Sequence, residues 1–208
     1  LKDSRGFIWF GTDRLGVRIY DPVNNKIFRN PDKPVSSSIP GNSVYIIIED
    51  IVKQIWIGTD KGIGRFVFKN QSYYPVHDHD FNKPLRNTYV QNLFEDQTGI
   101  IWIATGNGLF YFDRIKKIIK NYHAIDSESN GLNLDSINTI SELKNGELIV
   151  GSVNGLYILS RKRRINNIFR KDNGLSSNDI MAVLEDKRGR LWISTNNGIS
   201  RFDPKTET

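Results

Sequence analysis

The stretch Ile101-Trp102-Ile103-Ala104-Thr105 recurs, with small changes, five times along this chain of 208 residues. The other copies are Ile8-Trp9-Phe10-Gly11-Thr12, Ile55-Trp56-Ile57-Gly58-Thr59, Leu148-Ile149-Val150-Gly151-Ser152 and Leu191-Trp192-Ile193-Ser194-Thr195. Measured between second positions, successive copies are 47, 46, 47 and 43 residues apart. A period near this value indicates one supersecondary unit that is repeated, so the fold follows from the repeat.

Turn residues flank each copy of the phrase. In the third copy the turn before it reads Asp96-Gln97-Thr98-Gly99, and the turn after it is built on Asn107-Gly108. Asp bonds its own backbone, Gly accepts positive φ, and Asn-Gly between apolar runs is a strong hairpin signal. Two copies depart from the pattern, because Lys53 stands where glycine is usual and Leu15 is an extra residue in the later turn of the first copy.

Further apolar runs complete each unit. An inner strand before the acidic turn is expected over residues 43–49, 88–95, 136–142 and 179–185. The strand after the second turn is expected over residues 17–20, 63–68, 109–112, 156–159 and 199–202. A more polar outer strand is expected over residues 26–29, 72–77, 118–123 and 166–170. Four short antiparallel strands in about 45 residues are typical of a β-propeller blade, with a β-solenoid or a sandwich as the alternative.

The sequence therefore predicts an all-β fold, a β-propeller of four-stranded antiparallel blades. One partial propeller domain is expected over residues 1–208, with about 4.5 blades in units near 1–41, 42–86, 87–134, 135–177 and 178–208. The first unit lacks an inner strand and the last lacks an outer one, and these losses cannot complement each other in one circular closure. We expect an incomplete propeller whose exposed strand edges pair with further blades of a parent chain or with another copy.

The second position of the phrase holds every tryptophan of the chain. Its occupants are Trp9, Trp56, Trp102, Ile149 and Trp192. Exposed tryptophans can bind sugars or partners, but a residue needed once in each unit is more simply explained by packing between blades. We expect these five residues to be structural. Ile149 has less volume, so a neighbour is expected to compensate.

Composition excludes several classes of partner. The chain has no cysteine, so no disulfide scaffold forms, and no run of 18 apolar residues, so membrane contact is expected only through segments absent here. The net charge is +6, and the densest basic run is Arg161-Lys162-Arg163-Arg164. A nucleic-acid interface would need such a patch with interleaved aromatic residues. The run falls at a hairpin tip, so a solvated turn is expected and no nucleic acid is expected to bind through this region.

No catalytic or metal site can be assembled from the sequence. His77 and His79 share a strand face and, with Asp78 and Asp80, could hold a metal, but zinc sites need three or four convergent ligands. The polar face of an outer strand is the expected role of this pair, and His123 stands apart from it. There is no phosphate-binding loop, nucleophile elbow or HExxH phrase. We expect no metal, no cofactor and no enzyme activity; a propeller lyase would need an acid–base pair that is not visible.

Ligand contacts are expected in the connections between blades. These connections vary while the frame stays fixed, and variable loops on a fixed scaffold usually carry specificity. The candidate ligand-binding residues are Arg86, Asn87, Tyr89, Asn133 and Asp135. Their polar groups suit sugar hydroxyls, and an aromatic ring suits the C–H faces of a sugar. The alternative is a cap-like structural role, because polar residues recur at the entry to each inner strand.

Residues 185–203, which read EDKRGRLWISTNNGISRFD, resemble the two-component regulator propeller repeat nearly throughout. Residues 95–113 resemble it almost as well, and residues 173–180 are similar to the usual lead-in to a blade of that family. The resemblance covers essentially the whole chain. The departures at Leu15, Lys53 and Ile149 weaken single blades without changing the fold that it implies.

The resemblance implies a function as well as a fold. In that family the repeats form the extracytoplasmic sensor of hybrid sensor histidine kinases, notably in gut Bacteroidetes, where two seven-bladed propellers precede a third β-domain, a transmembrane helix and the kinase. It implies a periplasmic region that detects oligosaccharides and regulates polysaccharide-utilisation genes, with kinase activity outside this chain. The alternative is a propeller scaffold for protein–protein interaction or dimerisation, without a small ligand.

Overall fold

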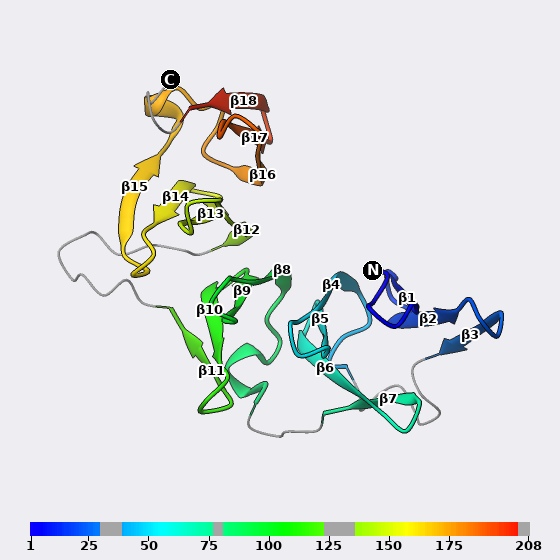
Figure 1. Ribbon diagram of the computed structural model, residues 1–208. Coiled ribbons are helices and arrows are strands. Elements are labelled where there is room, and N and C mark those ends of the chain that lie inside the picture. Colours follow the sequence, from blue (N-terminus) through cyan, green and yellow to red (C-terminus); the bar gives the residue numbers. More distant parts are fainter. Residues whose placement is uncertain (30–38, 77–80, 123–135, 204–208) are drawn as a thin grey trace. The chain divides into compact units, whose positions relative to one another are not determined.

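Five antiparallel sheets follow one another along the chain in the computed structural model, which describes residues 1–29, 39–76, 81–122 and 136–203 (Figure 1). Sheet 1 contains β1 (Ile8–Gly11), β2 (Val17–Asp21) and β3 (Lys26–Arg29). Sheet 2 contains β4 (Val44–Glu49), β5 (Ile55–Thr59), β6 (Gly62–Lys69) and β7 (Ser72–Pro75). Sheet 3 contains β8 (Val90–Glu95), β9 (Ile101–Thr105), β10 (Gly108–Asp113) and β11 (Ile118–Asn121). Sheet 4 contains β12 (Ile137–Glu142), β13 (Leu148–Ser152), β14 (Gly155–Leu159) and β15 (Ile165–Phe169), and sheet 5 contains β16 (Ile180–Glu185), β17 (Leu191–Thr195) and β18 (Gly198–Phe202).

The strands agree with those predicted from the repeat. Each begins and ends within two residues of its expected position, and the order within every sheet is that of the chain. Two short 3₁₀ turns, η2 (Lys83–Leu85) and η3 (Lys171–Asn173), are the helical elements of the described residues, and neither could span a bilayer. The all-β prediction is therefore confirmed.

The chain divides into two compact units, and the division passes through sheet 3. Unit 1 comprises Leu1–Ile103 with Phe112–Lys120, and unit 2 comprises Ala104–Tyr111 with Asn121–Thr208. Within unit 1 the inner strand β4 lies beside the inner strand β8, and within unit 2 β12 lies beside β16. Sheets 2 and 3, and likewise sheets 4 and 5, thus meet along their inner strands, and sheet 1 meets β4 through β1.

The repeated tryptophan position is buried in four of its five copies. Trp9, Trp56 and Trp102 are at most 2% exposed, and Ile149 is 1% exposed. The Trp9 ring packs on Phe66 and Tyr73 of sheet 2, with centroids 5.9 and 4.7 Å away. Trp192, in the last copy of the phrase, is 42% exposed. In the described part of unit 2, no sheet packs on that side of β17.

Each buried tryptophan is fixed by an aspartate six residues earlier. Trp9 Nε1–H donates to Asp3 Oδ2 at 2.8 Å. Trp56 Nε1–H donates to Asp50 Oδ2, and Trp102 Nε1–H donates to Asp96 Oδ2, each at 2.7 Å. The other carboxylate oxygen accepts backbone N–H groups of the turn, as Asp96 Oδ1 does from Thr98 and Ile100. In sheet 4 both partners change together, to Leu143 and Ile149, and both are buried. An unpaired buried carboxylate would be costly, so losing the indole favours losing the aspartate too.

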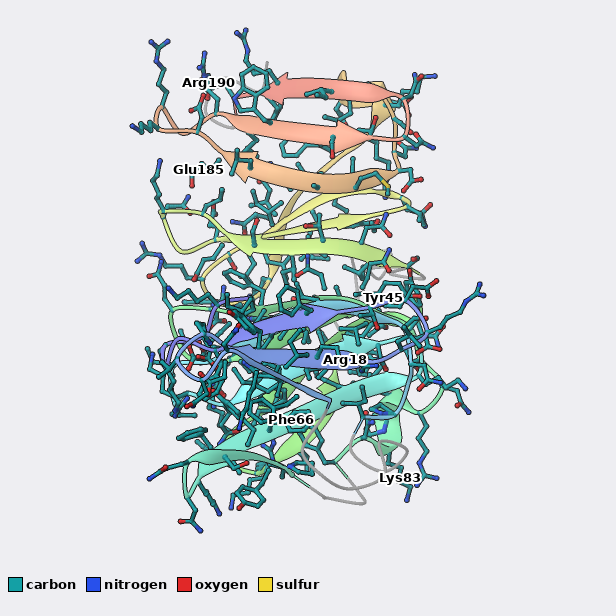
Figure 2. The ribbon with its side chains drawn as sticks, turned by 90° about the vertical axis from the view of Figure 1, so that its right-hand side faces the viewer. Arg18, Tyr45, Phe66, Lys83, Glu185 and Arg190 are labelled. Carbon is teal, nitrogen blue, oxygen red and sulfur yellow. The ribbon has the colours of Figure 1, made fainter. Side chains whose placement is uncertain are left out.

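The glutamate before this aspartate joins neighbouring sheets. Glu49 accepts the backbone N–H of Ser4 at 2.7 Å, and Glu95 accepts that of Ile51 at 2.7 Å. Glu185 accepts that of Lys144 at 2.9 Å in unit 2, at the turn end of sheet 5 where Figure 2 labels it. Each of these N–H groups belongs to the acidic turn of the preceding sheet. The repeated acidic residues thus have structural roles within and between sheets.

One departure in the sequence is explained by backbone geometry. The turn glycine takes a positive φ of 94° at Gly6 and 81° at Gly99, and Lys53 takes 65° at the same place. A side chain in this left-handed region costs roughly 1–2 kcal/mol. The turn of sheet 2 therefore keeps its shape with a less suitable residue.

The fourth position of the phrase is small because the next sheet approaches it closely. A Cβ added to Gly58 would lie 2.7 Å from Val90 Cγ1, and one added to Gly151 would lie 2.7 Å from Ile180 Cγ2. Val90 and Ile180 are the first residues of the following inner strands. Glycine at this position therefore sets the distance between consecutive sheets.

We expect Gly58→Ala to lower the free energy of unfolding by about 1–3 kcal/mol, because its methyl group would overlap Val90 and Ile46. Denaturant unfolding monitored by tryptophan fluorescence would measure the change. Ser194→Ala is the matched control, because Ser194 has the same place in the repeat and is not covered by another described sheet. Equal effects of the two substitutions would contradict this packing role.

Candidate functional site

Three of the five predicted ligand-binding residues lie together between η2 and β8. Arg86 and Asn87 are exposed, Asn87 has a positive φ of 55°, and Tyr89 is 37% exposed. Asn133 and Asp135 lie outside the described residues, as do His77, Asp78, His79, Asp80 and His123. Among the residues that are described, no three His, Cys, Asp or Glu side chains converge as a metal site would require.

Tyr89 forms an exposed aromatic pair with Tyr45, a residue that the sequence did not single out. The two ring centroids are 4.4 Å apart with planes at 53°, and Tyr45 is 46% exposed. Tyr45 lies near the start of β4, at the end of the strands and away from the core around Phe66 (Figure 2). The pair joins sheets 2 and 3 within unit 1 and presents ring surface to solvent.

Acidic side chains stand close to this tyrosine pair. Ser43 Oγ donates to Asp13 Oδ1 at 2.7 Å, and the Ser43 backbone N–H donates to Asp60 Oδ1 at 3.2 Å. Burial raises the pKa of Tyr45, and Tyr89 and the charges of Asp60 and Asp13 raise it further. A side-chain hydrogen bond with Tyr89 also raises the pKa of Tyr45, so the two phenol groups are linked to each other.

A β-bulge at the start of the inner strands explains why Tyr45 points outward. The pairing of β4 with β5 shifts register between Val44 and Ile46, which leaves Tyr45 as the extra residue. The same shift occurs in β12 at Asn138 and in β16 at Met181. A bulge redirects a side chain out of the ladder and is frequent beside functional sites. We call the second residues of β4, β8, β12 and β16 the bulge row, after the register shifts at Tyr45, Asn138 and Met181; the remaining member is Gln91.

The bulge row connects consecutive sheets in both units. In unit 2, Asn138 Nδ2 donates to Asp179 Oδ1 at 3.0 Å, and Asp179 precedes β16 as Tyr89 precedes β8. In unit 1, Gln91 is two residues beyond Tyr89, and its Oε1 is buried without a hydrogen-bond donor. A buried carbonyl oxygen without a donor costs roughly 1–3 kcal/mol. In unit 1 the Tyr45–Tyr89 pair is thus exposed, whereas the Gln91 acceptor nearby in the sequence is buried.

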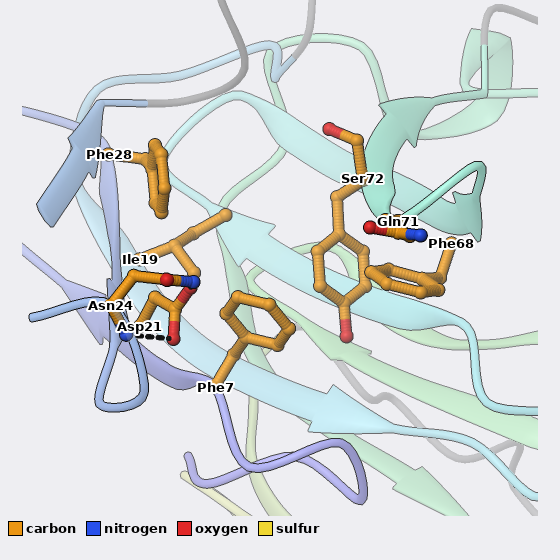
Figure 3. A pocket seen from close by; sticks show the side chains of 9 residues that line it. Phe7, Ile19, Asp21, Asn24, Phe28, Phe68, Gln71 and Ser72 are labelled. Carbon is orange, nitrogen blue, oxygen red and sulfur yellow. Dashed lines mark hydrogen bonds between the residues drawn. The ribbon is translucent and has the colours of Figure 1, made fainter. Parts of the chain in front are cut away.

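A separate cleft of about 230 Å³ lies between sheets 1 and 2 of unit 1 (Figure 3). Its lining consists of Phe7, Ile19, Asp21, Asn24, Phe28, Phe68, Gln71, Ser72 and Tyr73. Figure 3 shows Phe28, Asn24 and Asp21 on one side and Gln71, Ser72 and Phe68 on the other. Sequence reasoning missed this cleft because its two sides come from different repeats.

The polar groups of the cleft differ in how far they are satisfied. Asn24 Nδ2 donates to Asp21 Oδ2 at 2.7 Å, and this hydrogen bond, with backbone N–H donors, lowers the pKa of Asp21. Asp21 is therefore an anion at neutral pH. The Gln71 amide and the Ser72 hydroxyl have no hydrogen-bond partner among the described residues.

Comparison with known proteins identifies the repeats. The sequence pattern described as "Two component regulator propeller" matches residues 84–107 and 174–197. The first match includes Arg86, Asn87, Tyr89 and Gln91, and the second includes the phrase around Trp192. The chain therefore carries two-component regulator propeller repeats, and the resemblance drawn from the sequence is confirmed.

Relatives with this fold include sensor proteins. The chain is 32% identical over 84 residues to Histidine kinase P4 of Formosa agariphila. The aligned region covers 38% of this chain and 6% of that protein. It is 27% identical to the extracellular domain of BT4673 of B. thetaiotaomicron, assigned to a hybrid two component system; the match covers 94% of this chain and 25% of that one, with a TM-score of 0.68. PorZ of Porphyromonas gingivalis, a surface component of the type-IX secretion system, shares the fold with a TM-score of 0.74 and 21% identity. That match covers 97% of this chain and 31% of the PorZ chain.

These matches confirm the partial β-propeller. The chain spans between a quarter and a third of the length of these two structures and a small fraction of the histidine kinase. The structure of BT4673 is an extracellular domain, in agreement with the periplasmic location expected from the sequence.

Proposed function

We propose that this chain is part of the periplasmic sensor propeller of a hybrid two-component histidine kinase and that it binds an oligosaccharide. The observation that carries this proposal is the Tyr45–Tyr89 pair of unit 1, whose two rings are in contact and exposed to solvent. The propeller repeats and the extracellular domain of BT4673 support the sensor role. Kinase activity, gene regulation and membrane anchoring would belong to other parts of the parent protein.

An oligosaccharide suits this site for chemical reasons. Sugar C–H faces pack on aromatic rings, and sugar hydroxyls both donate to and accept from amide, carboxylate and phenol groups. Tyr45 and Tyr89 offer exposed rings, and their phenol oxygens can accept hydrogen bonds. Arg86 and Asn87 extend the same exposed segment, and Asn133 and Asp135 remain proposed contacts from the following connection.

We expect the double substitution Tyr45→Ala with Tyr89→Ala to weaken binding of its oligosaccharide by at least about tenfold, because it removes both ring surfaces. Calorimetry of the complete periplasmic region against neutral and acidic plant and algal oligosaccharides would measure the affinity. Tyr74→Ala is the matched control, since Tyr74 is an exposed tyrosine on β7 and outside the bulge row. Unchanged affinity in the double variant would contradict the site, and so would an equal loss in the control.

A scaffold role is the second candidate, and a different surface favours it. Leu184, Trp192 and Ile199 of sheet 5 are large apolar residues that are exposed together. Such a surface could pack against a further blade of the parent chain or against another copy. Sedimentation of the complete periplasmic region would test this role. A dimer that dissociates on Trp192→Asp, combined with no oligosaccharide binding, would favour the scaffold over the sensor.

A further inference from the structure

We infer that the cleft between sheets 1 and 2 binds one neutral sugar ring, as a site separate from the bulge row. This inference takes one element from the proposed function, namely that sugars are the molecules that the protein binds. The cleft volume, about 230 Å³, is below the roughly 300–1,000 Å³ of pockets that enclose a drug-sized ligand. It therefore has room for a single ring, either a monosaccharide or the end of a longer chain.

One wall of the cleft is aromatic and already rigid. Phe7, Phe68 and Tyr73 pack on one another, with centroids 4.9 to 6.2 Å apart. The Tyr73 hydroxyl donates to buried Asp3, which fixes the ring without help from a ligand. Phe28 of β3 faces this wall from the other side and is partly exposed. Two facing aromatic surfaces suit the two C–H faces of a pyranose ring.

The polar residues of the cleft suit hydroxyl groups. Gln71 and Ser72 have no partner among the described residues, so both can donate and accept without losing an existing bond. Gln71 is held with a positive φ of 61° at the tip of the β6–β7 turn, next to the cleft. Asp21 lies across from them as an acceptor. A ligand with several hydroxyls could engage both sides at once.

The charges around the cleft favour a neutral ring over an ion. Asp21 is anionic and repels a uronic acid or a sulfated sugar. A cation would seek the ring faces, but the Arg5 guanidinium already lies 4.6 Å from the centroid of Phe68 and 5.9 Å from that of Tyr73. Arg5, held by its ion pair with Glu49 at 3.3 Å, already occupies these ring faces, so a ligand cation would have to displace it. The remaining class is a polar, uncharged ligand.

The test is a titration of the full chain, followed by NMR chemical shifts, with methyl glycosides of glucose, galactose, mannose, xylose and arabinose. Galacturonic acid and glucosamine serve as the anionic and cationic probes. We expect at least one neutral glycoside to bind at millimolar concentration, and Phe28→Ala and Gln71→Ala each to weaken it by about tenfold or more. Both residues line the surface of the cleft, so neither substitution opens the core.

Two control variants show whether the glycoside binds in the cleft itself. Ile27→Ala changes the residue next to Phe28, which is exposed and does not line the cleft, and should leave the affinity unchanged. The Tyr45→Ala, Tyr89→Ala double variant should also bind the glycoside normally, whatever it does to oligosaccharides. The inference is overturned if no neutral glycoside binds, if a charged probe binds more tightly, or if the cleft variants bind as well as the parent protein. Failure of the bulge-row experiment would leave these outcomes unaffected.

Discussion

Replacing Trp102 with alanine is expected to lower the free energy of unfolding by about 3–5 kcal/mol, the range for a large aromatic residue lost from a core. Trp102 is 2% exposed, and its indole N–H donates to Asp96 Oδ2 at 2.7 Å. The substitution leaves a cavity and a buried carboxylate without one of its donors. Urea unfolding, analysed for both the midpoint and the slope, would measure the change.

Trp192→Ala provides the control for this experiment. Trp192 has the same place in the repeat, and its Nε1–H donates to Asp186 Oδ2 at 3.3 Å, but the side chain is 42% exposed. Its loss should cost less than the loss of Trp102, because 42% of the Trp192 side chain is already in contact with water. A small effect at Trp102, or equal effects at the two positions, would show that burial of the repeated tryptophan does not stabilise the fold.

The strands were predictable because the signals that define them are local. An aspartate turn, a β-branched or aromatic run and an Asn-Gly turn each lie within a few residues, and they recur with one period. Even the departure at Lys53 keeps the left-handed backbone that glycine provides in the other copies. The observed strand ends therefore differ from the predicted ones by no more than two residues.

The bulge row was less accessible from the sequence. Tyr45 follows Val44 in an apolar run, and a regular strand would place it in the ladder. The bulge adds one residue and redirects that side chain, and it depends on the pairing of β4 with β5. One signal in the sequence could have identified this row. Aligning the inner strands from their first apolar residue places Tyr45, Gln91, Asn138 and Met181 at the same position.

The cleft depends on side chains that differ between repeats. Ile19 pairs across the strands with Trp9, and the residue that pairs in this way with Trp56 is Arg65. Arg65 extends its guanidinium over Phe81 and Phe112, with centroids 4.7 and 5.5 Å away. Ile19 has no such reach. A repeat frame predicts what the blades share, so a site created by their differences requires the structure.

The paired change at Leu143 and Ile149 leads to the second large effect. Asp96→Leu should lower the free energy of unfolding by about 3 kcal/mol, because it leaves the buried Trp102 Nε1–H and the turn N–H groups of Thr98 and Ile100 without their acceptor. The same substitution at Asp186 should cost less, since the exposed Trp192 indole can donate to water. Thermal or urea unfolding of both variants would compare them.

A double-mutant cycle then tests whether the carboxylate and the indole form one structural pair. Asp96→Leu with Trp102→Ile reproduces in sheet 3 the combination that sheet 4 carries naturally at Leu143 and Ile149. With the indole gone, no buried N–H of that ring is left unsatisfied, and the leucine can fill part of the lost volume. The double variant should therefore be more stable than the sum of the single effects predicts, by at least about 1 kcal/mol. Additive losses would mean that the two residues act independently, and the joint replacement in sheet 4 would then need another cause.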